Sequence, residues 1–140
     1  MKKLVIFGTG DIAELAWHYF TNDSAYDVAA FTVDAEFRDT DSFCGLPLVD
    51  FETVADSYPT ADHGMFIALA YSGLNKLRRD KFEAALAMGY DLPSYVSSHA
   101  TALNEGRIGR NCFILEDNTI QPFVTIGDNV TLWSGNHIGH

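Results

Sequence analysis

A glycine turn and an acidic residue are the first features of the sequence that could bind a ligand. Residues 8–13 read Gly-Thr-Gly-Asp-Ile-Ala and fit the pattern G-x-G-x-x-A, in which glycines let a phosphate approach the backbone at the start of a helix. Asp34 follows Gly10 by 24 residues, and its carboxylate could accept hydrogen bonds from a ribose or a base. Together they indicate a nucleotide site. The alternative is a turn that only lets helix and strand pack closely, with Asp34 as a solvated loop residue.

Histidines are the side chains that could move protons near neutral pH. His140 ends the stretch "WSGNHIGH", which also contains His137. An imidazole there could take a proton from an attacking amine or hydroxyl and return it to a leaving thiolate, so His140 is a candidate general base. A tail position or a structural role are the alternatives. We expect the other histidines to be packing or surface residues: His18, His63 and His99.

The sequence offers no grouping typical of a metal site or a disulfide framework. Cys44 and Cys112 lie far apart and lack the short spacing of zinc ligands. We therefore expect two free thiols and no catalytic metal.

The charge balance limits the partners of the chain. The formal net charge is −10, whereas nucleic acids and anionic membranes need clustered Lys and Arg. We expect neither as a partner, although backbone N–H groups could still hold a phosphate-bearing small ligand. No apolar run is long enough to span a bilayer, and the start "MKKLVIFGTG" favours a first strand over a signal peptide. A cytoplasmic location follows as an expectation.

Residues 1–96 are predicted to form a small α/β domain with a parallel sheet. Buried strands are expected at 3–7, 26–34 and 64–70, and a shorter strand followed by a short helix within 46–56. Apolar residues at helical spacing predict helices over 8–20 and 73–90, with Leu15 and Leu77 turned inward and Gly89 ending the second helix. Residues 34–45 are interpreted as a loop. This leaves room for four strands at most, whereas a dinucleotide-binding fold needs about six, which favours a smaller nucleotide over NAD.

Residues 97–140 carry a six-residue repeat. An aliphatic residue recurs at Ile108, Ile114, Ile120, Ile126, Leu132 and Ile138, and Ala102 extends the series backwards. Small or β-branched residues follow several of them by four positions, namely Cys112, Val124 and Val130. Such hexads predict a parallel β-helix with three hexads per triangular coil and the aliphatic residues stacked inside. Because the last hexad is incomplete, we expect either a longer parent protein or a second chain over the open end.

The combination resembles one family. The stretches "VIFGTGDIAE", "FTVD", "IALAYSGLNKLRRDKF" and "WSGNHIGH" are similar to bacterial sugar acyltransferases of the sialic acid O-acetyltransferase type, and the likeness covers the whole chain. The resemblance implies an α/β fold in which a Rossmann-like domain precedes the first coils of a left-handed parallel β-helix. It also implies a homotrimer, a nucleotide-sugar or sugar substrate, and acetyl-CoA as cosubstrate.

The resemblance assigns roles to particular residues. His140 takes the position of the general base, and His137 is a candidate for binding substrate or orienting it. Gly8, Thr9 and Gly10 would lie under the phosphates or the sugar, with Asp34 near the uridine of a uridine-linked sugar. Tyr71 and Ser72 follow the strand at 64–70 and are expected to line the same cleft, because ligands sit at the carboxyl ends of parallel strands. Asn75 and Arg78, in the helix after them, could reach a phosphate. For Asn75 and Arg78, a helix cap and a solvated helix face are equally good interpretations.

Two other function classes stay open at this point. One is a non-catalytic module that binds a nucleotide-sugar and assembles through its β-helix. The other is a nicotinamide-dependent oxidoreductase, which rests on the glycine turn alone.

Overall fold

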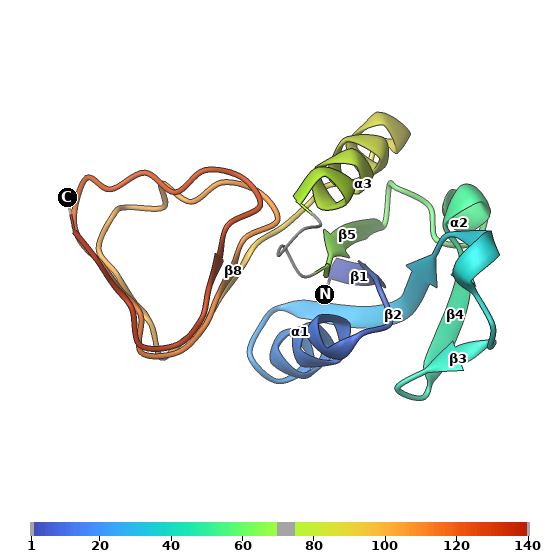
Figure 1. Cartoon of the computed structure of the whole chain (residues 1–140), viewed down its shortest axis with the longest axis horizontal. Coiled ribbons are helices and arrows are strands. Elements are labelled where there is room, and N and C mark those ends of the chain that lie inside the picture. Colours follow the sequence, from blue (N-terminus) through green and yellow to red (C-terminus); the bar gives the residue numbers. More distant parts are fainter. Residues whose placement is uncertain (1, 70–74, 140) are drawn as a thin grey trace. The chain divides into compact units, whose positions relative to one another are not determined.

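The chain divides into two compact units, Met1–Leu92 and Pro93–His140. The computed structural model describes residues 2–69 and 75–139, apart from the side chains of residues 75 and 137. The boundary predicted after residue 96 falls inside the first coil of the second unit, because Tyr95 and Val96 pair with Phe113 and Ile114. The described residues form a mixed α/β fold, and the three sheets among them are built almost entirely from parallel strands (Figure 1).

The first unit is a five-stranded sheet with the order β3-β4-β2-β1-β5. Its strands are β1 (Lys2–Phe7), β2 (Tyr26–Val33), β3 (Ser42–Phe43), β4 (Leu46–Asp50) and β5 (His63–Ile67). Its helices are α1 (Asp11–Asn22), α2 (Val54–Ser57) and α3 (Asn75–Met88), with 3-10 turns η1 (Ala35–Phe37) and η2 (Phe51–Thr53). The pairs β1–β2, β1–β5 and β2–β4 are parallel, and β3–β4 is antiparallel. The carboxyl ends of the parallel strands therefore meet along one edge.

Both faces of this sheet are buried, which explains the continuous apolar runs of its strands. Side chains alternate between faces along each strand. Val5 and Met65 belong to the cluster that also contains Phe82 of α3. On the other face, Phe66 contacts Phe20 of α1 with ring centroids 5.0 Å apart. Figure 1 shows α1 and α3 on opposite faces of the sheet.

Three local predictions for this unit were wrong. Leu15 and Leu77 were expected to point inward, but they are 37% and 42% exposed. Other residues form the buried faces of the two helices, namely Ala13, Ala16 and Phe20 on α1 and Arg78, Phe82 and Ala85 on α3. The expected loop 34–45 contains η1 and the short strand β3. A hairpin turn at Cys44 and Gly45, both with positive φ, folds β3 back onto β4.

The second unit is a coil that returns to the same position every 18 residues. Its strands are β6 (Tyr95–Val96), β7 (Thr101–Ala102), β8 (Phe113–Ile114), β9 (Thr119–Ile120), β10 (Thr131–Leu132) and β11 (His137–Ile138). They stack in parallel as β6-β8-β10 and β7-β9-β11, and Ile108 bridges to Ile126 on a third side. Bonds between stacked positions join residues 18 apart, and Figure 1 shows the coil as a three-sided loop.

The hexad residues form the core of this coil. Ile114, Ile120 and Cys112 are fully buried, and Ile108, Leu132 and Ile138 pack against them. Ala102 keeps the repeat and pairs with Ile120, but it is exposed, so its expected place inside the coil was wrong.

Corners of the coil are made by a left-handed residue at every sixth position. The positions are Glu105, Asn111, Asp117, Phe123, Asn129 and Gly135, with φ between 54° and 86°. Asn, Asp and Gly tolerate this conformation well, whereas Phe does not. Phe123 therefore occupies a strained corner position.

Buried asparagines link successive coils. The Asn118 side-chain amide donates to the carbonyls of Leu115, Leu132 and Trp133, and its Oδ1 accepts the backbone N–H of Asn136, 18 residues later. Asn104 also donates to backbone carbonyls, but its buried Oδ1 has no hydrogen-bond partner in the part of the chain that the structure describes. Its counterpart 18 residues later is Pro122, which has no N–H to give.

Candidate functional site

The glycine turn lies against the carboxyl edge of the first sheet. Gly8 has φ +127°, and a Cβ at this position would lie 2.7 Å from the carbonyl oxygen of Ala68. The Gly8 N–H donates to Thr32 O at 3.0 Å, and the Ala68 N–H donates to Phe7 O at 2.9 Å. Only glycine allows this close approach, so the turn is fixed to the ends of both neighbouring strands.

The turn leads into α1 with an open N-terminus. Gly10 is the N-cap residue, with φ −93°, and no atom lies within 4 Å of the place where its Cβ would be. Thr9 and Gly10 are both exposed. The first backbone N–H groups of a helix carry partial positive charge and can bind an anion. Asp11 and Glu14 in the first turn reduce that attraction.

Asp34 follows β2 and faces a lysine from α3. Its Oδ1 lies 2.5 Å from Lys81 Nζ, and the two side chains are 17% and 18% exposed. The ammonium also lies over the rings of Phe51 and Phe7, at 4.9 and 5.5 Å from their centroids. Two ring faces and a carboxylate thus stabilise a largely buried cation.

These groups surround one cavity of about 230 Å³. It is lined by Phe7, Gly8, Thr9, Gly10, Val33, Asp34, Phe37, Leu69, Leu77 and Lys81. The structure therefore brings together four residues that the sequence singled out, namely the Gly-Thr-Gly turn and Asp34. Their part in binding stays a prediction.

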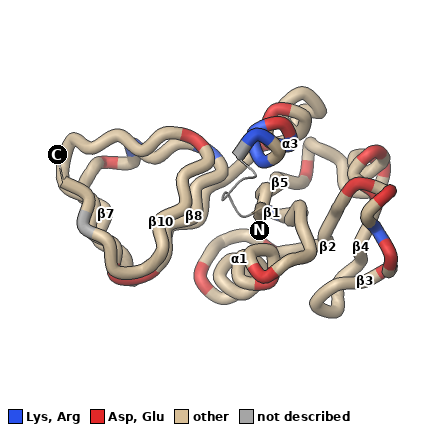
Figure 2. Tube along the Cα trace, in the orientation of Figure 1, with Lys and Arg blue, Asp and Glu red and all other residues tan. Residues whose placement is uncertain are grey.

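Sequence reasoning missed Lys81, Phe37 and Leu77. A lysine on an amphipathic helix looks like a solvated residue, and nothing in the local pattern sets Lys81 apart. The clearest available signal was the concentration of basic residues in the first half of α3, at Lys76, Arg78, Arg79 and Lys81 (Figure 2). Helices usually carry acids at that end.

Other predicted site residues are placed differently or lie outside the described part. Arg78 is buried, 4% exposed, and does not line this cavity, so the solvated-face alternative is wrong for it. Tyr71, Ser72 and His140 lie outside the described residues, as does the side chain of Asn75. His137 begins β11 and pairs with Thr119, and its side chain is also outside the description.

The remaining histidines and the cysteines have ordinary surroundings. His63 is buried, with Nδ1 3.0 Å from Pro59 O, while His18 and His99 are exposed. Both cysteines are free thiols. Burial, together with the nearby Glu14, raises the pKa of Cys44 above its ordinary value, which disfavours a reactive thiolate.

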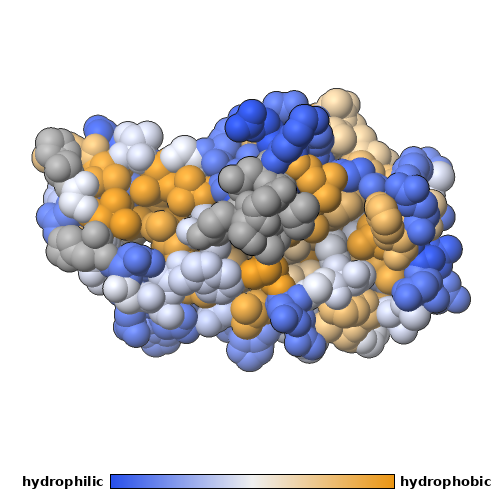
Figure 3. Space-filling model, in the orientation of Figure 1, coloured by the Kyte–Doolittle hydropathy of each residue, from blue (hydrophilic) through white to orange (hydrophobic). Residues whose placement is uncertain are grey.

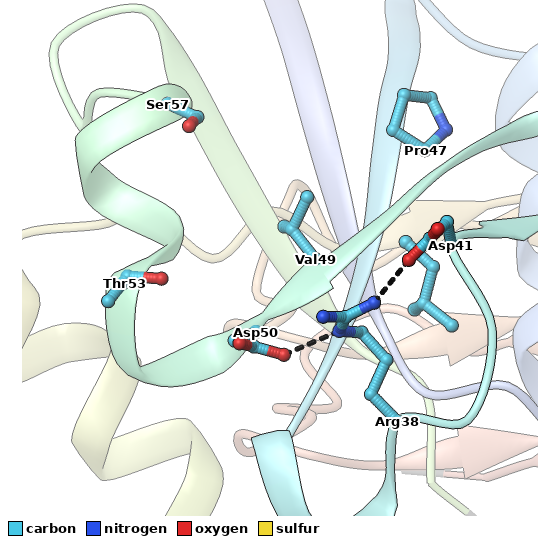
Figure 4. A pocket seen from close by; sticks show the side chains of 8 residues that line it. Arg38, Asp41, Pro47, Val49, Asp50, Thr53 and Ser57 are labelled. Atoms are coloured by element: carbon cyan, nitrogen blue, oxygen red, sulfur yellow. Dashed lines mark hydrogen bonds and ion pairs between the residues drawn. The ribbon is translucent and has the colours of Figure 1, made fainter.

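A second cavity of about 380 Å³ lies beside β4 and α2 (Figure 4). Arg38 Nε donates to Asp50 at 2.6 Å, and Nη1 donates to Asp41 at 2.6 Å and to Thr40 O at 3.1 Å. The hydrogen bonds to Asp50 and then Asp41 raise the pKa of Arg38 further above its ordinary value. These bonds use Nε and Nη1 of the guanidinium, and they tie the segment that follows η1 to the end of β4.

Within residues 2–69 and 75–139, no group of three or more His, Cys, Asp or Glu side chains is arranged to hold a metal ion. None of the described helices is long and apolar enough to cross a membrane.

Comparison with known proteins finds a family match in the second unit. Residues 106–140 match the family model "Bacterial transferase hexapeptide (six repeats)". A comparison with curated proteins finds no match.

Solved structures share the fold of the chain. The acetyltransferase domain of PglB from Neisseria gonorrhoeae FA1090 is 21% identical, with a TM-score of 0.79, over 100% of this chain and 66% of that one. The complex of that domain with acetyl coenzyme A is 20% identical, with a TM-score of 0.78, over 99% of this chain and 65% of that one. A histidine-to-asparagine mutant of perosamine N-acetyltransferase from Caulobacter crescentus was solved with CoA and GDP-perosamine. It is 21% identical, with a TM-score of 0.80, over 99% of this chain and 63% of that one. The chain thus spans less than two thirds of each of these chains, and the similarity establishes the fold.

Proposed function

We propose that the chain is part of an acetyl-CoA-dependent acyltransferase that modifies an amino or hydroxyl group of a nucleotide-linked sugar. The observation that carries the proposal is that one chain joins the cavity at Gly8, Thr9, Gly10 and Asp34 to a hexad coil. Sugar acetyltransferases with the same fold support it, since one was solved with acetyl coenzyme A and another with CoA and GDP-perosamine.

The finer assignment follows the resemblance seen in the sequence. We infer a Rossmann-like nucleotide-sugar-binding domain, a left-handed β-helix and a relationship to the sialic acid O-acetyltransferase type. A homotrimer formed through the β-helix and a cytoplasmic location belong to the same proposal. The net charge of −10 favours a small-molecule substrate over nucleic acid.

The first unit would hold the nucleotide part of the substrate. In this proposal the open N-terminus of α1 and the Gly-Thr-Gly turn lie under the phosphates, and Asp34 accepts hydrogen bonds from the nucleoside. Further contacts to phosphate or sugar are assigned to Tyr71, Ser72, Asn75 and Arg78.

His140 would supply the proton chemistry, with His137 helping to bind substrate or orient the ring. The nitrogen or oxygen of the sugar forms a bond to the acetyl carbon, and the carbon–sulfur bond of the thioester breaks. A neutral imidazole takes the proton from the nucleophile and returns it to the departing thiolate. Acetyl-CoA is a cosubstrate here, and no step needs a metal.

An acetyl-transfer assay tests this proposal. The chain is incubated with acetyl-CoA and a panel of UDP- and GDP-linked amino sugars, and release of the CoA thiol is measured. Replacing His140 by Ala should lower kcat by roughly 100-fold or more, the usual contribution of a general base. His18→Ala, an exposed change on α1, should leave the rate unchanged.

The assay also separates the alternatives. Binding of a nucleotide-sugar without acetyl transfer would favour the non-catalytic binding module. Saturable binding of NADH would favour the nicotinamide enzyme. The first sheet has four parallel strands and one antiparallel strand among the described residues, fewer than the six of a dinucleotide fold, so we expect no NADH binding.

A further inference from the structure

The cavity beside β4 and α2 has no part in the proposed function. Its volume of about 380 Å³ lies within the range usual for small-molecule sites. The described residues that line it do not line the cavity at the glycine turn, so it is a separate place in the first unit. On the face seen in Figure 3, hydrophilic and hydrophobic residues meet over the region of β4 and α2, at the right of the view. A lining of both kinds is typical of sites that bind small ligands.

One nitrogen of the Arg38 guanidinium stays open to the cavity. Nε donates to Asp50, and Nη1 donates to Asp41 and to Thr40 O. In Figure 4 the third nitrogen, Nη2, carries no dashed line, and it makes no hydrogen bond with the residues that the structure describes. The existing bonds hold the guanidinium in place. A ligand that accepts a hydrogen bond from Nη2 therefore costs little further side-chain entropy.

Two residues at helix starts also turn their side chains away from their usual role. Asp50 is the N-cap residue of η2 and Thr53 is the N-cap residue of α2, yet neither side chain makes a capping bond. Asp and Thr at such positions ordinarily accept a backbone N–H of the helix. Ser57 follows Thr53 by four residues, so the two hydroxyls lie on the same side of the helical turn. All three side chains line the cavity together with Arg38 (Figure 4).

The charges of the cavity disfavour an anionic ligand. Arg38 is its one cation among the described lining residues, whereas Asp41 and Asp50 are both acidic. The excess of carboxylates would repel a phosphate or a carboxylate group. A neutral hydroxyl group can instead donate to Asp50 and accept from Arg38 Nη2. The hydroxyls of Thr53 and Ser57 can serve as donor or acceptor to the same ligand.

Apolar side chains complete the lining: Pro47, Leu48 and Val49. Side chains alternate along a strand, so Pro47 and Val49 lie on the same face of β4. A sugar ring carries C–H groups between its hydroxyls. Such a ring can therefore pack on an apolar surface while its hydroxyls bind polar groups around it.

We propose that this cavity is a second binding site, which takes a neutral sugar ring. The ring packs against Pro47 and Val49, and its hydroxyls bind Arg38 Nη2, Asp50 and the hydroxyl of Thr53. This sugar is not the one attached to the nucleotide, because the cavity lies apart from the glycine turn. The inference goes beyond the proposed function and does not depend on acetyl transfer.

Titration of the full chain with the methyl glycosides of glucose, galactose and N-acetylglucosamine tests the proposal, followed by ¹H–¹⁵N NMR. At least one glycoside should shift the amide signals of Val49, Thr53 and Ser57 in a saturable way. Thr53→Val keeps the side-chain shape and removes the hydroxyl, so it should weaken binding by roughly three- to tenfold, the net worth of one hydrogen bond. Because Thr53 makes no capping bond, the thermal midpoint of Thr53→Val should equal that of the wild type. Ser57→Ala should weaken binding to a similar extent.

Thr21→Val is the matched control, since Thr21 is exposed on α1 and does not line the cavity. It should bind the glycoside like the wild type. Neither inorganic phosphate nor UDP should displace the glycoside, because the carboxylates repel anions and the nucleotide is assigned to the other cavity. Absence of saturable shifts with all three glycosides, equal binding by Thr53→Val, or displacement by phosphate or UDP would overturn the sugar site. Titration with nucleotides alone and the acetyl-transfer assay judge the proposed function separately.

Discussion

The two glycines of the turn should respond to substitution in opposite ways. Adding a methyl group to Gly8 forces a side chain onto φ +127° and places its Cβ 2.7 Å from Ala68 O and 3.4 Å from Ala13 Cβ. A non-glycine residue in such a region costs about 1–3 kcal/mol, and the backbone oxygen cannot swing away. We therefore expect Gly8→Ala to lower the free energy of unfolding by about 3 kcal/mol or more.

Gly10→Ala is the matched control. Its φ of −93° suits any residue, and no atom lies within 4 Å of the new methyl group. The only loss expected is that Ala is a poorer N-cap residue than Gly. That change should cost at most about 1 kcal/mol. The new methyl group should nevertheless weaken nucleotide binding, because Gly10 lines the cavity.

Thermal and denaturant unfolding followed by circular dichroism measure the difference. A destabilisation of this size should lower the midpoint of Gly8→Ala by about 10 °C relative to wild type. If Gly8→Ala and Gly10→Ala unfold within about 1 kcal/mol of each other, the close approach of the turn to the sheet is refuted. Equal nucleotide affinity of Gly10→Ala and wild type would refute the use of this turn by the ligand.

Three further predictions concern the core and the titration of single groups. Asn118→Asp should destabilise the coil by about 3 kcal/mol or more in urea unfolding, because a buried carboxylate would face three carbonyls; unchanged stability would contradict the asparagine link. Burial raises the pKa of Tyr90, which donates to Tyr58 O, to about 12, so absorbance at the tyrosinate band should show a late titration that Tyr90→Phe removes. Because the pKa of Tyr90 is higher in the folded than in the unfolded chain, its neutral hydroxyl contributes to folding stability in full below the ordinary value of 10.0. That contribution is lost as pH rises toward about 12. Hydrogen bonds from Arg110 lower the pKa of Asp128, so the contribution of this carboxylate to folding stability is present above the ordinary value of 3.8 and is lost as pH falls through the lowered value. NMR titration should show the lowered pKa, and Arg110→Ala should return it toward the ordinary value.

Local patterns were enough to predict the parallel sheet and the hexad coil. Buried strands read as continuous apolar runs, and the six-residue repeat places Ile114 and Ile120 inside the coil. Both signals lie within short stretches of sequence, so no distant contact was needed to find them.

The cavity was harder to predict because it depends on contacts between distant segments. Lys81 meets Asp34 from 47 positions along the chain, and Leu77 is exposed because Arg78, Phe82 and Ala85 form the buried face of α3. The left-handed corner at Phe123 could not be predicted from residue type, since the repeat and not the side chain imposes it.

Isothermal titration of the chain with UDP and GDP tests the central claim most directly. We predict saturable binding of one nucleotide, weakened roughly tenfold or more by Asp34→Asn, which removes a charged acceptor from the cavity. Asp27→Asn, an exposed change on β2, should bind like wild type. No binding at millimolar nucleotide, or equal binding by Asp34→Asn, would contradict the assignment of a nucleotide site to the first unit.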